Sequence, residues 1–259
     1  MASRSTQTPA KKAELAYESV RRAIIEQALV PGTKLPEDLL CQQFGVSRTL
    51  VRAVLGRLAS EALVEIGNKR TATVAQPSLD EARAVFEVRR CLEAEVVRLV
   101  IERWTPAMGA ELEGHVREEA VAARSGHGPV SIRLAGEFHV RLAEMAGNPL
   151  LQRYVSDVVT RCSLILAVYG RPHSSDCAVN EHQQLIAALR KKDAATAMQL
   201  MSAHLGGIES RALSPERPRG GPDLAQVLAR YRDDVSPVQA IAPLKPAAAA
   251  PAARRTAKR

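Results

Sequence analysis

Residues 44–63 read FGVSRTLVRAVLGRLASEAL, and this stretch decides the fold of the N-terminal part of the chain. Gly45 provides a tight turn, and Ser47 is a good N-cap for the helix that follows. A shorter apolar segment around Leu39 and Leu40 precedes the turn, so the sequence predicts a helix, a turn and a second helix. Apolar residues recur at helical spacing and predict the buried face of that second helix: Leu50, Val51, Val54, Leu55 and Leu58.

The flanking segments extend this pattern into a domain over residues 13–75. Upstream, an apolar helical stripe from Tyr17 to Ala28 stops at VPGTKLPE (30–37), which contains a Pro-Gly turn. Downstream, LVEIGNKRTATVA (63–75) alternates in two short runs about a Gly-Asn turn, which predicts a two-stranded hairpin. Three helices followed by a hairpin form the winged helix-turn-helix arrangement.

The third predicted helix carries residues suited to DNA. Arg48 and Arg52 lie four residues apart, so they share one exposed face near the helix N-terminus, beside Ser47 and Thr49. In helix-turn-helix proteins this end enters the major groove, where arginine can bridge two acceptors of guanine and a hydroxyl can bind phosphate. The pair alone also fits an ordinary solvated face, but the complete five-element pattern favours double-stranded DNA as a partner. Two further basic residues beside the hairpin turn are candidate DNA contacts: Lys69 and Arg70.

Composition supports a mainly α protein. The chain has 259 residues, aromatic residues make up only 3% of them, and no run of 18 or more residues is apolar. We therefore expect no membrane-spanning segment, and the N-terminus lacks the apolar core of a secretory signal. The four cysteines form no CxxC pair and suit a reduced, cytoplasmic compartment: Cys41, Cys91, Cys162 and Cys177.

The net charge of +8 is concentrated at the two ends of the chain. We expect residues 1–12 to form a disordered basic arm and residues 214–259, rich in Pro, Ala and basic residues, to form a disordered tail. A basic tail suits a polyanion such as DNA, and it can equally serve only to keep the protein in solution.

Residues 76–213 form a second, nearly neutral block that reads as six helices, with a split in one of them left open. It opens with a capping box, Ser78 to Glu81. Three histidines project from apolar faces of separate predicted helices: His139, His182 and His204. They are either ordinary core histidines or the ligands of a metal, since three neutral imidazoles suffice for Zn²⁺ with a fourth group from water or a ligand.

The N-terminal part resembles the DNA-binding domain of GntR-family transcription regulators. The resemblance is carried by PGTKLPE (31–37), GVSRTLVR (45–52) and LGRLASEALVE (55–65). It implies DNA contacts at Arg48, Thr49 and Arg52 and at the wing near Arg70. The chain departs from the family where Leu50 replaces a usual proline, Ala53 a common glutamate and Thr71 a wing glycine. The operator sequence therefore cannot be transferred from the family.

The second block resembles the FCD effector domain of the FadR subfamily of GntR regulators. The matching segments are EVRRCLEAE (87–95), EFHVRLAEMAGNPLL (137–151) and NEHQQLIAALRKKDAATAMQLMSAHL (180–205). Many such domains bind a divalent metal with three histidines and an aspartate, and Ala135 stands at the aspartate position here. The resemblance thus implies a metal, zinc by preference, at His139, His182 and His204.

The same resemblance implies an effector pocket lined by the three histidines. It also places Arg89 and Asn148 at the pocket, although Arg89 has the spacing of an ion pair with Glu93 and Asn148 precedes a proline at a helix break. We thus expect an effector- and dimerisation domain over residues 76–213.

The function that follows is a ligand-responsive transcription regulator of the bacterial type. It is expected to bind a near-palindromic operator as a homodimer, with a small organic acid or a related metabolite as effector and with repression as the family default. The alternative is a metal-dependent hydrolase built on the three histidines. Against an enzyme, no general base accompanies the histidines in the sequence and no GxSxG motif is present.

Overall fold

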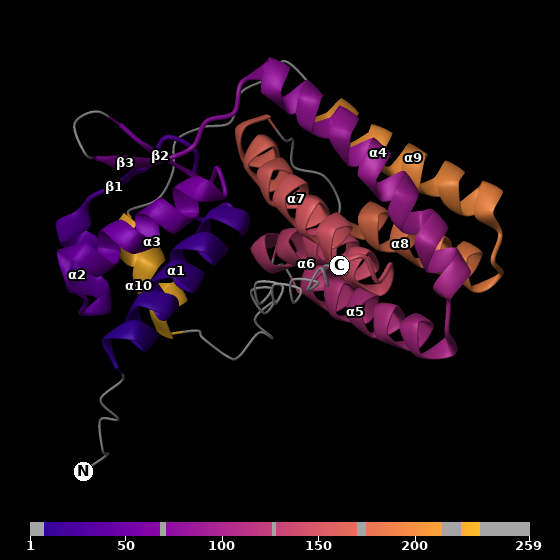
Figure 1. Cartoon of the computed structure of the whole chain (residues 1–259), viewed down its shortest axis with the longest axis horizontal. Helices are drawn as coiled ribbons and strands as arrows, with labels where there is room; N and C mark the ends of the chain where they lie inside the picture. Colours follow the sequence, from indigo (N-terminus) through magenta and orange to yellow (C-terminus); the bar gives the residue numbers. More distant parts are fainter. Residues whose placement is uncertain (1–7, 68–70, 126–127, 170–174, 214–223, 234–259) are drawn as a thin grey trace, which may run out of the picture.

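A computed structural model describes residues 8–67, 71–125, 128–169, 175–213 and 224–233. The described part is mainly α-helical, as predicted, with a small sheet near the N-terminus (Figure 1). The N-terminal domain contains α1 (Pro9–Ile25), β1 (Lys34–Leu35), α2 (Glu37–Phe44), α3 (Arg48–Ser60), β2 (Val64–Ile66) and β3 (Ala72–Val74). The remaining helices are α4 (Leu79–Arg103), α5 (Pro106–Arg124), α6 (Gly128–Met145), α7 (Pro149–Tyr169), α8 (Ser175–Arg190), α9 (Ala194–Ala212) and α10 (Leu224–Asp233).

The helix-turn-helix is formed by α2 and α3. Gly45 ends α2 with a φ of +61°, a left-handed conformation that glycine adopts without steric cost. Ser47 then caps α3, because its hydroxyl accepts a hydrogen bond from the backbone N–H of Leu50 at 3.4 Å. Both features were predicted from the sequence, and together they fix the angle at which α3 leaves the turn.

The sheet has three strands where the sequence predicted a two-stranded hairpin. Strand β1 pairs antiparallel with β3, so the strand order is β1-β3-β2, with Lys34 opposite Thr73. The two residues of β1 are too short a segment to show an alternating pattern, and only the fold brings them beside β3.

Two terminal predictions need correction. Helix α1 begins at Pro9, capped by Thr8, so residues 9–12 are helical rather than part of a disordered arm. Residues 224–233 form α10 within the segment predicted to be a disordered tail, because apolar side chains of this short helix are buried against the N-terminal domain. The rest of the predicted tail and residues 1–7 lie outside the described residues.

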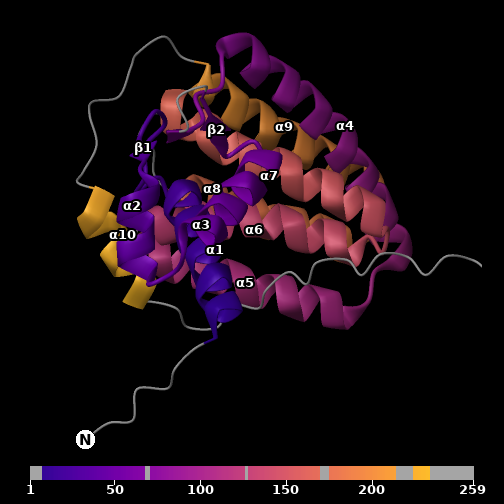
Figure 2. The same cartoon turned by 60° about the vertical axis from the view of Figure 1, so that its left-hand side comes forward.

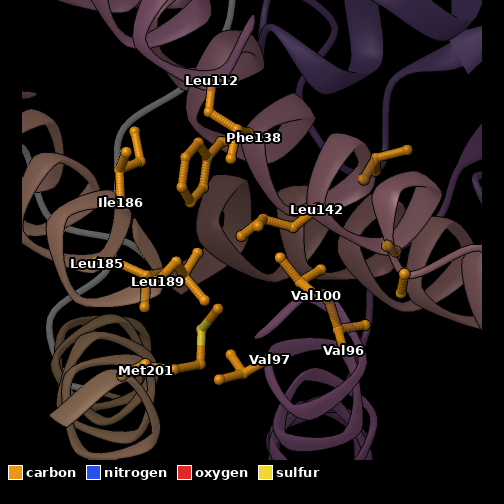
Figure 3. Packing of buried hydrophobic residues seen from close by; sticks show 14 of the residues in the cluster. Val96, Val97, Val100, Leu112, Phe138, Leu142, Leu185, Ile186, Leu189 and Met201 are labelled. Atoms are coloured by element: carbon orange, nitrogen blue, oxygen red, sulfur yellow. The ribbon is translucent and has the colours of Figure 1, made fainter. Parts of the chain in front are cut away.

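Helices α4 to α9 pack into the second domain, which matches the predicted six helices within the described residues (Figure 1). In its core, side chains from several helices interdigitate. Figure 3 shows Phe138 and Leu142 of α6 facing Leu185 and Leu189 of α8. Such burial of apolar surface is the main stabilising contribution to a helical bundle of this kind. None of the described helices is long and apolar enough to cross a membrane.

The two domains touch where α1 lies near α7. Arg21 of α1 donates a hydrogen bond to the hydroxyl of Thr160 on α7 at 3.1 Å. Arg161, the next residue of α7, donates to the backbone carbonyl of Ala62 and to the carboxylate of Glu81 at the start of α4. The junction therefore combines arginine hydrogen bonds with an apolar contact, since Leu164 of α7 is buried in the apolar cluster of the N-terminal domain.

Candidate functional site

The first candidate site is the exposed N-terminal end of α3. Its buried face packs Val51, Leu55 and Leu58 into the N-terminal core, which turns the opposite face to solvent. Ser47, Thr49 and two arginines lie on that exposed side, and the side chains of Arg48 and Arg52 are 65% and 53% exposed. The structure thus brings together the four predicted contacts of the recognition helix, as a major-groove reader requires.

Two acidic residues at the start of α2, which the sequence reasoning missed, hold these arginines. Glu37 accepts from the Nε of Arg52 at 2.9 and 3.0 Å, and Asp38 lies 2.7 Å from a guanidinium nitrogen of Arg48. Both guanidinium groups stay largely exposed, where ion pairs are weak, so a guanine edge or phosphate can compete for them. The predicted wing contacts Lys69 and Arg70 lie outside the described residues.

The second candidate site is a cluster of three buried histidines in the helical domain. Helices α6, α8 and α9 each supply one: His139 (1% exposed), His182 (1%) and His204 (5%). Their candidate ligand atoms all lie within 4.8 Å of one another. His182 also stacks on Phe138, with ring centroids 3.9 Å apart. The structure therefore brings together three residues that are 43 and 22 positions apart in the sequence.

Each histidine of the cluster is held by a glutamate at its Nδ1 atom. His139 contacts Glu93 of α4, His182 contacts Glu119 of α5 at 2.9 Å, and His204 contacts Glu181 of α8 at 2.6 Å. An ionised carboxylate can only accept hydrogen bonds, so each Nδ1 carries the proton. These are the carboxylate–histidine pairs that orient imidazoles at metal sites.

In this tautomer, each Nε2 atom of the cluster carries a lone pair and no proton. The Nε2 atoms of His139 and His204 lie 3.1 Å apart, and the Nε2 of His182 is buried without a hydrogen-bond partner among the described residues. Two facing lone pairs repel unless a cation lies between them. Ligands of a tetrahedral zinc ion at about 2.05 Å are about 3.3 Å apart, which the His139–His204 spacing approaches. The donor set thus fits a divalent cation.

The pKa values of His139 and His204 agree with neutral ligands. Burial lowers the pKa of His139 to about 3 and also lowers the pKa of His204. Burial opposes ionisation of Glu93, but the charges of His139 and Arg89 outweigh it and lower its pKa to about 2. Neutral imidazoles beside ionised carboxylates are the protonation states that metal binding requires.

Arg89 and Asn148 do not point at the three histidines directly. Arg89 is buried and donates from Nε to Glu93 at 2.6 Å and from Nη1 to Cys162 at 3.2 Å, so the structure contains the ion pair that its spacing indicated. Asn148 is exposed at the start of α7, where its amide oxygen accepts from the N–H groups of Leu150 and Leu151. Arg89 is hydrogen-bonded to Glu93, which in turn holds His139, and Asn148 serves as a helix cap.

The sequence reasoning missed the three glutamates that orient the cluster. A signal existed for two of them, since Glu93 and Glu119 interrupt otherwise apolar helical stripes and a lone acid in a buried stripe needs a partner. Glu181 is partly exposed and gave no such signal. All three carboxylates lie on the Nδ1 side of the imidazoles, so they orient the rings and do not supply a general base beside the Nε2 atoms.

Comparison with known proteins assigns both domains. Residues 12–74 match the bacterial regulatory proteins of the gntR family, and residues 84–207 match the FCD domain. The chain is 24% identical over 192 residues to the uncharacterized HTH-type transcriptional regulator YdhC of Bacillus subtilis, which covers 73% of this chain and 85% of YdhC. It is also 24% identical over 193 residues to the HTH-type transcriptional repressor RspR of Escherichia coli, a match that covers 74% of this chain and 85% of RspR.

The fold has relatives among solved structures as well. Escherichia coli McbR/YncC superimposes with a TM-score of 0.68 at 22% identity, over 80% of this chain and 95% of that one. The matching families and these relatives are transcription regulators, so the hydrolase alternative is not supported. The matches agree with the structure, which has an N-terminal winged helix-turn-helix and a C-terminal helical domain. The chain therefore belongs to the GntR family of transcription regulators with an FCD domain.

Proposed function

We propose that this protein is a ligand-responsive repressor of the FadR subfamily that acts in the cytoplasm and binds a near-palindromic operator as a homodimer. The observation that carries the proposal is the pair of exposed arginines, Arg48 and Arg52, in the first turns of α3. The similarity to the repressor RspR supports repression as the outcome. Exposed Val88 on α4 and Met198 on α9 are apolar side chains suited to a contact between two copies.

We further propose that the histidine cluster holds a divalent cation, zinc by preference, within the effector site. His139, His182 and His204 would bind the cation through Nε2, which removes the lone-pair repulsion described above. The bound cation would present a Lewis-acidic position to an anionic ligand. Ala135, one turn before His139 on α6, offers no ligand atom, which leaves a coordination position for a carboxylate of a small organic acid.

In this proposal Arg89 acts on the effector site through Glu93 and not by touching the ligand. Its guanidinium is buried and donates from Nε to Glu93 and from Nη1 to Cys162. By holding one oxygen of Glu93, it leaves the other oxygen for the Nδ1–H of His139. Effector binding would then favour one arrangement of the helices around the cluster, and thereby one pose of the DNA-binding domains.

The recognition helix is tested by Arg48→Ala and Arg52→Ala. The operator is first selected from a random DNA pool with the parent protein. Each variant is expected to bind this operator about 5- to 150-fold more weakly than the parent, because a bidentate guanine contact is worth roughly 1–3 kcal/mol. Gel-shift titration at fixed salt measures the loss. Arg98→Ala, which removes an exposed arginine from α4, serves as the charge-matched control and should bind like the parent. Parent-like binding by both α3 variants would contradict the assignment.

The basic C-terminal end is tested by deleting residues 241–259. The deletion removes five basic residues and no acidic ones: Lys245, Arg254, Arg255, Lys258 and Arg259. We expect weaker binding to DNA of unrelated sequence and a shallower salt dependence, because each phosphate contact contributes about 0.9 to the logarithmic salt slope. The slope is measured by fluorescence anisotropy between about 50 and 200 mM salt, a range over which binding through phosphate contacts weakens strongly. An unchanged slope would leave the tail a role in solubility alone.

A further inference from the structure

Helix α10 lies outside both family-matched segments, yet it packs against the DNA-binding domain. Val227 and Leu228 are buried in the same apolar cluster as Val20 and Ile24 of α1. Figures 1 and 2 both place α10 beside α1 and α2, although it is far from both helices in the sequence. A ten-residue helix is unstable alone in water, so these apolar contacts explain why the segment is helical here.

The C-terminal end of α10 makes polar contacts with the same helix. The hydroxyl of Tyr231 donates to the carboxylate of Glu26, and its backbone carbonyl accepts from the hydroxyl of Ser19 at 3.2 Å. The guanidinium of Arg22 lies over the Tyr231 ring, 5.3 Å from its centroid. Helix α10 is thus attached through an apolar contact and through a tyrosine that reaches a buried acid.

That acid also connects the two domains. Glu26 is buried directly after α1 and accepts from the Nε of Arg22 at 2.9 Å. The same oxygen accepts from the Nε of Arg133 on α6 at 2.8 Å, while Arg133 also donates to Glu137 at 2.6 Å. A buried carboxylate needs several hydrogen-bond donors to offset its lost hydration, and here they come from α1, α6 and α10.

Helix α6 carries His139, about 1.7 turns beyond Arg133. The contact at Glu26 therefore lies on the same rigid element as the histidine cluster. One histidine-bearing helix, α6, is thus linked to the DNA-binding domain through Arg133.

We propose that α10 is an interdomain brace: by docking on α1 and contacting Glu26 through Tyr231, it holds the Glu26–Arg133 ion pair and so fixes the DNA-binding domain against α6. The brace deepens the proposed function, since it names the contact through which the effector domain sets the pose of the recognition helices. The contacts of the brace lie within one chain and involve no DNA or effector, so the brace can be tested without either.

The test is amide hydrogen exchange of the full chain, comparing the parent with Leu228→Asp and Tyr231→Phe. Placing a charge in the apolar contact should release α10 and speed exchange at least about tenfold in α1 and in the N-terminal half of α6. Removal of the Tyr231 hydroxyl keeps the ring and should speed exchange about 3- to 10-fold in the same two segments, because Glu26 loses one donor. Matched controls are Leu150→Asp and Tyr154→Phe, both on exposed side chains of α7.

Faster exchange in both α1 and α6 supports the brace. Faster exchange in α1 alone would show that α10 only stabilises the DNA-binding domain and would overturn the proposal, as would parent-like exchange in Tyr231→Phe. Should Leu228→Asp fail to fold, Tyr231→Phe still decides, because it removes a single oxygen. A failure to find any operator would contradict the proposed function but leave this result standing.

Discussion

Replacing Glu93 with alanine is expected to destabilise the protein by about 3–5 kcal/mol, because it leaves a buried arginine without its counter-ion. Glu93 is 1% exposed and accepts from Arg89 on one oxygen and from His139 on the other. Its loss strands the guanidinium of Arg89 beside Cys162 and removes the acceptor of the His139 Nδ1–H.

Denaturant unfolding followed by circular dichroism measures this loss. Glu95→Ala is the matched control, since Glu95 lies two residues further along α4 and pairs with Arg98 at the surface. A solvent-exposed pair of this kind contributes little to stability, so the control should unfold almost like the parent. Equal stabilities of the two variants would mean that the Arg89–Glu93–His139 contacts do not form in solution.

The N-terminal fold could be predicted because its signals are local. Gly45 and Ser47 specify a turn and a helix start within three residues, and the apolar stripe of α3 repeats at helical spacing over the next turns. The exposed positions of Arg48 and Arg52 follow from the same periodicity. The three histidines were likewise predicted to be buried, since each shares a helix face with apolar neighbours.

Other features could not be predicted, because they depend on partners far along the chain. Strand β1 is defined by Thr73 and Ala72 of β3, and α10 is defined by the face of α1 on which it docks. The pairing of Glu93 with His139 joins residues 46 positions apart, and no spacing rule within one helix reveals it. Sequence periodicity tells which face of a helix is buried, but it does not tell which helix covers that face.

The histidine cluster makes the second large prediction: metal-stripped protein should bind Zn²⁺, and His182→Ala should bind it far more weakly. Loss of one of three nitrogen ligands should exceed the roughly 10–100-fold loss that follows removal of an outer hydrogen-bond partner at metal sites. Titration calorimetry on the stripped protein measures both affinities. Glu119→Gln, which alters only the acceptor at His182 Nδ1, should fall within that smaller range.

A control for burial is available in His115 of α5. It is buried like the cluster histidines, but its Nε2 contacts the backbone carbonyl of Leu134, and it is not among the three clustered residues. His115→Ala should therefore lower stability without changing the affinity for Zn²⁺. Equal zinc affinities of the His115→Ala and His182→Ala proteins would show that a loss of packing, not of a ligand, explains the result.

Ala135→Asp should raise the affinity for Zn²⁺ above that of the parent. An aspartate one turn before His139 on α6 projects from the same helix face and adds an anionic oxygen to three neutral nitrogens. The same change should weaken binding of a carboxylate effector, because the new side chain occupies the coordination position that the effector needs. Calorimetry with zinc alone, and thermal shift with zinc plus a panel of small organic acids, separate these effects. If neither the parent nor the Ala135→Asp protein binds zinc, the histidines do not converge on a cation, and they are buried core histidines held by three glutamates.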